Sequence, residues 1–261
     1  MPVARFAVTE EVCLPSRRGR LQERQYAAPA LGVVLSGCVD YRAPGGSATA
    51  VPGAVIFANA GEHFTCRHRT TRGNRRRVVT FHPDFLREVA TVRGEIAHFR
   101  AAVIPPGKIS CALFGQIRRL TLGFMDAEEL AFELAASALQ IDRCANARVR
   151  VSARDRQRVV SVVRHLEEAF AEPCSLTSLA QRVQLSPYYF LRMFKRVTGQ
   201  SPAQYVLNLR LRATADELLG TQAQVAQIAF RAGFNDLSHF NSSFRAAFGM
   251  NPARWRQGVR P

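Results

Sequence analysis

Short alternations of hydrophobic and polar residues dominate the first hundred positions of the chain. Turn-forming stretches rich in glycine and proline divide this region, and the segments between them are rich in β-branched and aromatic residues. Four such segments are predicted to be strands: residues 31–43, 54–60, 63–69 and 76–82. Many short strands joined by regular turns are typical of a β-sandwich or a β-barrel.

Helical spacing of apolar residues replaces this alternation in residues 112–143. One face would carry Phe124, Leu130, Leu134, Ala138 and Ile141. A helix or helix pair here could pack on the strands, mediate dimerisation, or do both, and the sequence leaves these alternatives open. We expect a first domain over residues 1–143, a polar and charged linker over residues 144–155, and an all-helical domain over residues 156–261.

The C-terminal region contains the same pattern twice. Residues 185–202 and 234–252 align at an offset of fifty positions. The aligned pairs are Phe190 and Phe240, Phe194 and Phe244, Lys195 and Arg245, Gly199 and Gly249, and Pro202 and Pro252. Helix pairs repeated at a fixed period also build α-solenoids, but two copies are fewer than a solenoid normally needs.

The first copy, residues 175–199, predicts two short helices joined by a tight turn. Ser175 is placed to cap the first helix, and Ser186 to cap the second, with Pro187 at its first position. Gly199 is placed to end the second helix, whose buried stripe holds Phe190, Met193, Phe194 and Val197. Its outer face carries Tyr188, Tyr189, Leu191, Arg192, Lys195 and Arg196. This pattern predicts a helix-turn-helix whose second helix enters the major groove.

The second copy, residues 224–249, predicts another helix-turn-helix. Gly233 permits the turn, and Asn235 or Asp236 can cap the second helix. The offset from the first copy changes from forty-nine to fifty within this turn, which indicates one extra residue. The buried stripe holds Phe240, Phe244 and Phe248, and the outer face carries Leu237, Ser238, His239, Asn241, Ser242 and Arg245.

The segment between the copies, residues 202–220, has helical spacing of apolar residues. About seventeen helical residues there would span about 25 Å. Such a rod could hold the two recognition helices for consecutive major grooves on one face of DNA, which lie about 34 Å apart.

The charge of the chain fits an anionic partner. The formal net charge is +16, and a soluble protein this basic usually meets an anionic polymer or surface. Residues 155–261 carry 14 Lys and Arg against 7 Asp and Glu, whereas residues 1–154 carry 22 against 13. Because both halves are basic, charge alone does not locate a nucleic-acid site.

Four potential metal ligands lie close together in the sequence of the first domain: His63, Cys66, His68 and His82. Cys66 and His68 are two residues apart on a predicted strand, so they share a face, and the intervening turn could bring His82 towards them. Cysteine and histidine can bind zinc or iron, but the alternative is that these side chains only line the domain. We expect no resident cofactor, and Cys66, His68 and His82 are the candidates if a metal is bound.

The remaining features exclude several other classes. The six cysteines are scattered without a C-x-x-C pair, and the N-terminal residues lack a signal-peptide core, so we expect reduced thiols and a cytoplasmic protein with no membrane partner. No phosphate loop, nucleophile elbow or zincin helix occurs, so we do not expect an enzyme. Residues 75–77, a run of three arginines, are expected to form a solvated turn and strand start.

The C-terminal pattern resembles the AraC/XylS family of bacterial transcription regulators. The resemblance covers roughly the last hundred residues, and the segment IAFRAGFNDLSHFNSSFRAAFGMNP is similar to the family's most diagnostic segment. Residues 51–68 resemble, more weakly, the hairpin of a cupin-type sensor domain. The resemblance implies an α+β chain: a cupin-like β-barrel with following helices, then an all-α domain of two helix-turn-helix modules joined by a long helix.

The resemblance also implies contacts and partners. In the first module it implies that Tyr188, Leu191 and Arg192 meet bases, and Arg192 suits guanine because it can bond O6 and N7 together. In the second module it implies Leu237, Ser238, Asn241 and Ser242, with Arg245 suited to phosphate. The implied partner is double-stranded DNA, while RNA polymerase, a small-molecule effector and a second copy of the chain stay open. The rival hypotheses are a cupin-type metal-dependent enzyme or sensor with a DNA-localising tail, and a non-specific DNA binder.

Overall fold

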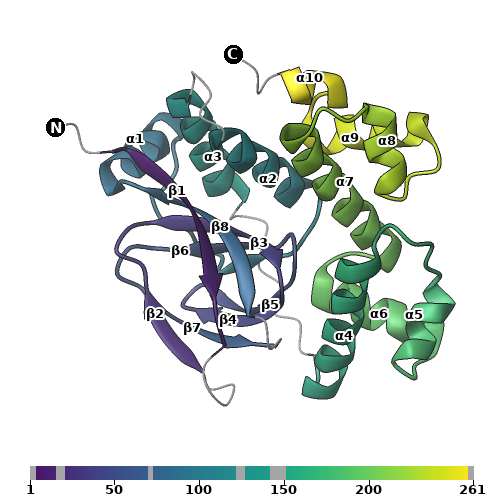
Figure 1. Ribbon diagram of the computed structural model, residues 1–261. Helices are drawn as coiled ribbons and strands as arrows, with labels where there is room; N and C mark the ends of the chain where they lie inside the picture. Colours follow the sequence, from purple (N-terminus) through teal and green to yellow (C-terminus); the bar gives the residue numbers. More distant parts are fainter. Residues whose placement is uncertain (1–3, 16–20, 70–72, 122–126, 142–150, 258–261) are drawn as a thin grey trace. The chain divides into compact units, whose positions relative to one another are not determined.

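The computed structural model of this protein describes residues 4–15, 21–69, 73–121, 127–141 and 151–257. The chain divides into two compact units. The first, called here the β unit, comprises residues 1–105 and 123–150, and the second, the helical unit, comprises residues 106–122 and 151–261. Figure 1 shows the strands of the β unit in purple and blue and most of the helical unit in green and yellow.

The β unit contains two antiparallel sheets (Figure 1). One sheet has five strands in the order β1-β8-β3-β6-β9, and the other has four in the order β2-β7-β4-β5. The strands are β1 (Phe6–Cys13), β2 (Gln22–Gln25), β3 (Ala30–Ser36), β4 (Val39–Ala43), β5 (Gly46–Ala50), β6 (Val55–Ala58), β7 (His63–His68), β8 (Asn74–Phe81) and β9 (Val103–Ile104). A core of side chains from both sheets, among them Val34, Ile56, Tyr41 and Phe64, is buried between them.

The predicted strands correspond to observed strands with one difference. The single strand predicted over residues 31–43 is a pair, β3 and β4, because Gly37 takes a positive φ of 76° and reverses the chain between them. β1, β2, β5 and β9 were not among the predicted strands. β1 pairs with β8 along its whole length, from Phe6 opposite Phe81 to Cys13 opposite Asn74.

The arginine run at the start of β8 is solvated only in part, because Arg75 alone of the three is exposed as the sequence suggested. Arg76 and Arg77 are buried. Arg76 donates to Glu11 at 3.0 Å and Arg77 to Glu10 at 3.1 Å, and both acids lie on β1. The acidic residues of a strand that sequence reasoning missed therefore neutralise the arginines and allow them to be buried, since a buried charge needs a partner.

Two helices complete the β unit. α1 (Pro83–Arg93) begins at His82, whose Nδ1 accepts from the backbone NH of Asp84. α3 (Ala127–Ile141) packs on α1. Leu134 and Ala138 of the predicted apolar face are buried, whereas Phe124 and the side chain of Ile141 lie outside the described residues.

The helical unit contains eight helices in the part of the chain that the structure describes. They are α2 (Lys108–Thr121), α4 (Ala153–Ala169), α5 (Leu176–Arg182), α6 (Pro187–Thr198), α7 (Pro202–Gly220), α8 (Val225–Arg231), α9 (Leu237–Phe248) and α10 (Pro252–Gln257). Figure 1 shows α7 in the middle of this unit, and its contacts include α6, α8, α9 and α10.

The observed division differs from the predicted domain boundaries at two places. α2, expected in the first domain, contacts α7 and α9 and belongs to the helical unit. Gly115 on α2 faces the rings of Phe248 and Trp255 so closely that a Cβ there would lie 3.1 and 3.2 Å from them. The predicted linker also ends early, because Ser152 caps α4 and residues 153–155 are helical; residues 144–150 lie outside the described chain.

Candidate nucleic-acid interface

The helical unit contains two helix-turn-helix modules of equal dimensions. α5 and α8 each have seven residues and start forty-nine positions apart, whereas α6 and α9 each have twelve residues and start fifty positions apart. This confirms the sequence repeat and places the extra residue in the second turn. α6 and α9 both end at a glycine in the left-handed conformation, Gly199 and Gly249.

Polar caps fix where these helices begin. Ser175 and Ser178 form a reciprocal capping box at α5, and the hydroxyl of Ser186 accepts from the backbone NH of Tyr189 at α6. At α9 the cap is Asp236 rather than Asn235, with Oδ1 accepting from the NH of Ser238 at 2.7 Å. A cap of this kind stabilises a helix by about 1 kcal/mol.

The two turns differ at one equivalent position. Gly233, with φ of 90°, occupies the place in the second turn that Gln184, with φ of 55°, occupies in the first. Among the described residues Gln184 is the single non-glycine with positive φ. A residue with a side chain loses roughly 1–2 kcal/mol of stability in the left-handed conformation, whereas glycine does not. The first turn is therefore strained at Gln184, and the second is not strained at Gly233.

Aromatic side chains hold each recognition helix to its module. Phe190 and Phe194 on α6 are fully buried, with ring centroids 5.5 Å apart, and Phe240 and Phe244 on α9 repeat this pair at 5.6 Å. Truncating a buried Phe to Ala typically costs 3–5 kcal/mol. Since these rings occupy the inner face, the opposite face of each helix is left for a partner.

Arg210 on α7 links the segment before the first module to the turn of the second. Its guanidinium donates to the carbonyl oxygens of Phe170 at 2.8 Å and Glu172 at 3.2 Å, ahead of the first module. It also donates to the carbonyl of Gly233 at 2.7 Å, in the turn of the second module. Partial burial lowers the pKa of Arg210, but an arginine stays charged in proteins. The residue therefore holds the turn of the second module against the helix that joins the two.

Comparison with known proteins identifies this region. The model of a family described as a helix-turn-helix domain matches residues 179–258. The transcriptional activator RhaS of Escherichia fergusonii is 38% identical over 101 residues, which are 39% of this chain and 36% of that protein. A transcriptional regulator of Chromobacterium violaceum with an AraC-type DNA-binding domain is 29% identical over 42% of this chain and 97% of its own, with a TM-score of 0.39. The C-terminal helix-turn-helix region is therefore similar to that of AraC/XylS-type transcription regulators.

The match to these relatives is partial. The chain spans about a third of the length of the curated relatives it matches. A further solved structure, the DNA-binding domain of AdpA in complex with a target DNA, is 28% identical over 39% of this chain and 92% of its own, with a TM-score of 0.38. The cupin-type identity of the β unit stays a prediction.

Most of the predicted contact residues lie on the outer faces of α6 and α9. Arg192 is exposed, and its guanidinium lies 5.7 Å from the centre of the Tyr189 ring. The exposed members of the two sets are Tyr188, Arg192, Lys195, Arg196, Ser238, His239, Asn241, Ser242 and Arg245, while Tyr189, Leu191 and Leu237 are half-buried. That these residues contact DNA stays a prediction.

Tyr189 has a second neighbour that sequence reasoning did not foresee. Its hydroxyl donates to Oδ2 of Asp155 on α4 at 3.2 Å. Hydrogen bonds to Asp155, from the Ser152 hydroxyl first and then from Tyr189, lower the pKa of this carboxyl group. Tyr189 therefore ties α6 to α4 and supports the Arg192 side chain, which fits a positioning role.

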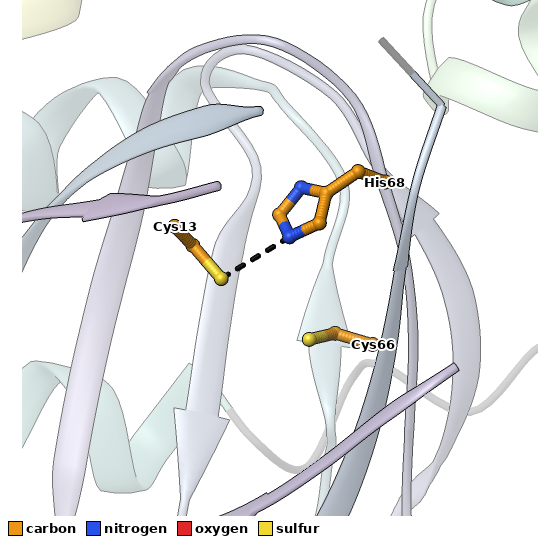
Figure 2. A group of neighbouring side chains, drawn as sticks. All are labelled: Cys13, Cys66 and His68. Carbon is orange, nitrogen blue, oxygen red and sulfur yellow. Dashed lines mark hydrogen bonds between the residues drawn. The ribbon is translucent and has the colours of Figure 1, made fainter. Parts of the chain in front are cut away.

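The metal candidates of the β unit come together only in part. Cys66 and His68 meet Cys13 of β1, and the three ligand atoms lie within 4.8 Å of one another (Figure 2). His82 is elsewhere, as the cap of α1, and the exposed His63 faces Glu23. Cys13 was missed because β1 was not predicted, so no pattern placed it opposite β7.

The surroundings of this cluster shift the pKa values of its two thiols in opposite directions. The Cys13 Sγ lies 3.1 Å from Nε2 of His68 (Figure 2). A hydrogen bond from Cys66, together with the imidazole of His68, lowers the pKa of Cys13 despite its burial. The pKa of Cys66 is raised, because its thiol is the donor in that bond and is itself buried.

Proposed function

We propose that this chain is a sequence-specific DNA-binding transcription regulator that inserts α6 and α9 into successive major grooves. The observation that supports this most directly is the congruence of the two modules, each with a twelve-residue second helix held by a buried Phe pair. Their outer faces combine groups that can read base edges, such as Arg192 and Asn241, with cations suited to phosphate, such as Lys195 and Arg245.

The joining helix supports a two-groove arrangement. α7 has 19 residues, which corresponds to a length of about 28 Å. Consecutive major grooves on one face of DNA lie about 34 Å apart. A rigid α7, fastened to the second turn through Arg210, would keep two recognition helices at a fixed spacing without requiring a dimer.

The β unit would supply regulation. Its cupin-like sandwich is the proposed place for a small effector, for dimerisation, or for both, and RNA polymerase would be a partner at the promoter. No described helix has the length and apolarity required to cross a membrane. We expect the protein to act in the cytoplasm, where its DNA target lies.

Footprinting of the full chain on genomic fragments selected by binding tests the proposal. We expect one protected stretch of about two helical turns at each selected site, because two recognition helices cover two grooves. The matched control is Phe244→Ala, which removes a buried ring of α9 without changing charge and should shorten the protected stretch to about one turn. Diffuse coverage at all salt concentrations would instead indicate a non-specific DNA binder.

The thiol–imidazole cluster favours a second candidate function. A cupin-type metal-dependent enzyme or sensor could use the helical unit only for localisation. Transcript profiles separate the two: if regulation is the function, Arg192→Ala should misregulate the same genes as deletion of the whole chain. A localised enzyme would keep most of its cellular effect when sequence recognition is lost.

A further inference from the structure

Three ligand-bearing side chains of the β unit converge from two different sheets. Cys13 ends β1 in the five-stranded sheet, whereas Cys66 and His68 lie on β7 in the four-stranded sheet. Cys66 and His68 are two residues apart, so both point to the inner face of β7. Figure 2 shows the two sulfur atoms and the imidazole facing one another across the space between the strands.

The spacing of these atoms suits a metal ion. In a tetrahedral site with Zn–S of about 2.3 Å and Zn–N of about 2.0 Å, the ligand atoms are roughly 3.5–3.8 Å apart. Here Cys13 Sγ and His68 Nε2 are 3.1 Å apart, and no ligand pair exceeds 4.8 Å. Rotamer adjustments of less than about 1 Å would bring all three to bonding distance of one ion.

A fourth donor lies beside the two sulfur atoms. Oε1 of Gln22 on β2 is 3.8 Å from the Sγ of Cys13 and 3.8 Å from the Sγ of Cys66. Gln22 is the register partner of Cys66 across the β2–β7 ladder, and its Nε2 donates to the carbonyl oxygen of Leu14 at 3.3 Å. An amide oxygen here could complete a four-coordinate site, and without it the three protein ligands form a trigonal one.

Buried polar atoms without hydrogen-bond partners belong to the cluster and to a residue beside it. His68 Nδ1 and both side-chain polar atoms of Asn74 are buried and lack a hydrogen-bond partner among the described residues. Asn74 is the register partner of Cys13 on β8. Unpaired buried polar groups are costly, and several around one cluster indicate a ligand that the protein atoms alone do not provide.

We infer that Cys13, Cys66 and His68 bind one thiophilic d10 cation, Zn²⁺ or Cu⁺, in the β unit. Thiolate and imidazole ligands select such ions over Mg²⁺ or Ca²⁺, which take oxygen ligands. Two arginines, Arg24 and Arg76, lie near the thiols and favour their thiolate forms, and Arg76 is itself paired with Glu11. An ion held from β1 and β7 would fasten the two sheets together. This inference does not rest on the proposed function, since metal uptake is measured without DNA.

Metal titration of the reduced, full-length protein tests the inference. We expect one Co²⁺ per chain, with a thiolate-to-cobalt charge-transfer band that Zn²⁺ removes, or one Cu⁺ per chain in competition with a Cu⁺ chelator under anaerobic conditions. The ion whose binding saturates at the lower free concentration is the one that the site prefers. Binding to the folded state alone also raises the melting temperature of the wild-type chain, which requires no variant.

Single substitutions assign the ligands. Cys13→Ala, Cys66→Ala and His68→Gln should each weaken binding about 100-fold or more, because even a lost partner of a ligand costs 10–100-fold. The matched controls are Cys174→Ala, an exposed cysteine of the helical unit, and His82→Ala, which removes a helix cap. Both should bind as the wild type does.

Two results would overturn the inference. One is a wild-type protein whose melting temperature and near-ultraviolet spectrum do not respond to Co²⁺, Zn²⁺ or Cu⁺. The other is loss of two thiols on mild oxidation, mapped to a Cys13–Cys66 disulfide, in a protein that takes up no metal when reduced. That second outcome would identify the cluster as a redox pair instead.

Discussion

The guanidinium of Arg210 donates a hydrogen bond of 2.7 Å to the carbonyl oxygen of Gly233, and this contact joins the middle of α7 to the turn of the second module. The same side chain also bonds the carbonyls of Phe170 and Glu172. One residue therefore satisfies backbone acceptors on both sides of the joining helix. Arg210 also lines an open groove that Phe230, Asp236 and others border.

Replacing Arg210 by Met should loosen the second module while keeping much of the side-chain volume. Hydrogen bonds to charged groups contribute about 1.5–3 kcal/mol each, and partial exposure places the expected loss in unfolding free energy at about 1–3 kcal/mol in total. Urea unfolding measures it. Arg210→Lys is the control. It keeps the charge but cannot donate to three carbonyl groups at once as the guanidinium does, so it should be more stable than Arg210→Met and less stable than the wild type.

DNA binding by the same variant gives an independent readout. Arg210→Met should weaken binding to a full site more than binding to a site truncated to one groove, since only the full site depends on a fixed spacing. Equal losses on both targets would show that Arg210 stabilises the fold without setting the geometry of the pair.

Substitutions at the equivalent turn positions Gln184 and Gly233 should change the stability in opposite directions. Gln184→Gly removes the left-handed penalty of a side chain, offset by the flexibility of glycine in the unfolded chain, so we expect a change between zero and about 1 kcal/mol of stabilisation. Gly233→Ala should destabilise by more than about 2 kcal/mol, because its Cβ would lie 2.4 Å from the carbonyl oxygen of Ala171.

Gly249→Ala separates the cost of the left-handed backbone conformation from the cost of a steric clash. Gly249 has a φ of 75°, but a Cβ there would meet nothing within 4 Å. Its substitution should therefore cost only the left-handed penalty of about 1–2 kcal/mol. Thermal unfolding of the three variants orders them, and equal losses for Gly233→Ala and Gly249→Ala would contradict the close approach.

The helical unit was predicted well because its signals are local. Caps such as Ser186, a proline at the first helical position and a terminal glycine act within one turn of helix, so neighbouring residues suffice to place α6. The assignment of α2 to this unit could not be predicted, since the contact of Gly115 with Phe248 joins residues far apart in the sequence.

The β unit was predicted less completely for the same reason. β1 has the sequence FAVTEEVC, in which Thr9, Glu10 and Glu11 interrupt the apolar positions, and its partner, β8, is more than sixty positions away. Local alternation therefore did not predict it. The failure to predict β1 had two consequences. Arg76 was expected to be solvated because its partner Glu11 was not placed beside it. The predicted metal ligands also included His82 instead of Cys13.

Arg192 is the residue for which we expect the strongest effect on sequence specificity. Arg192→Ala should cost about 1–3 kcal/mol at the cognate site and relax the preference at the base pair it reads. Arg245→Ala is the contrast, because loss of a phosphate contact weakens binding to all sequences alike and reduces the salt slope by about one. Binding isotherms on the cognate site and its single-base variants, at several salt concentrations, measure both. A uniform loss for Arg192→Ala would remove it as a base reader.

Asp155 predicts a pH dependence of the helical unit. Its pKa is lowered in the folded protein, by the Ser152 hydroxyl first and by Tyr189 next, so its contribution is present at neutral pH and is lost as the pH falls through that lowered value. Asp155→Asn should therefore lower the melting temperature at pH 7, and the difference from wild type should shrink as the pH falls below the ordinary Asp pKa of about 3.9. A difference that stays constant across this range would show that the charge of Asp155 is not what stabilises the contact.

Trp255, the single tryptophan of the chain, reports whether α2 packs in the helical unit. Its indole donates to the carbonyl of Ala215 at 3.1 Å and its ring lies against Phe248 and Gly115. Gly115→Leu would force a side chain into this contact, so we expect a loss of about 1–3 kcal/mol and a red-shifted tryptophan emission as the ring becomes more exposed. Gly220→Ala is the control, because a Cβ there meets nothing within 4 Å and should leave both readouts unchanged or slightly stabilise α7. If Gly115→Leu behaved like Gly220→Ala, α2 would not pack against α9 and α10, and the helical unit would begin at α4.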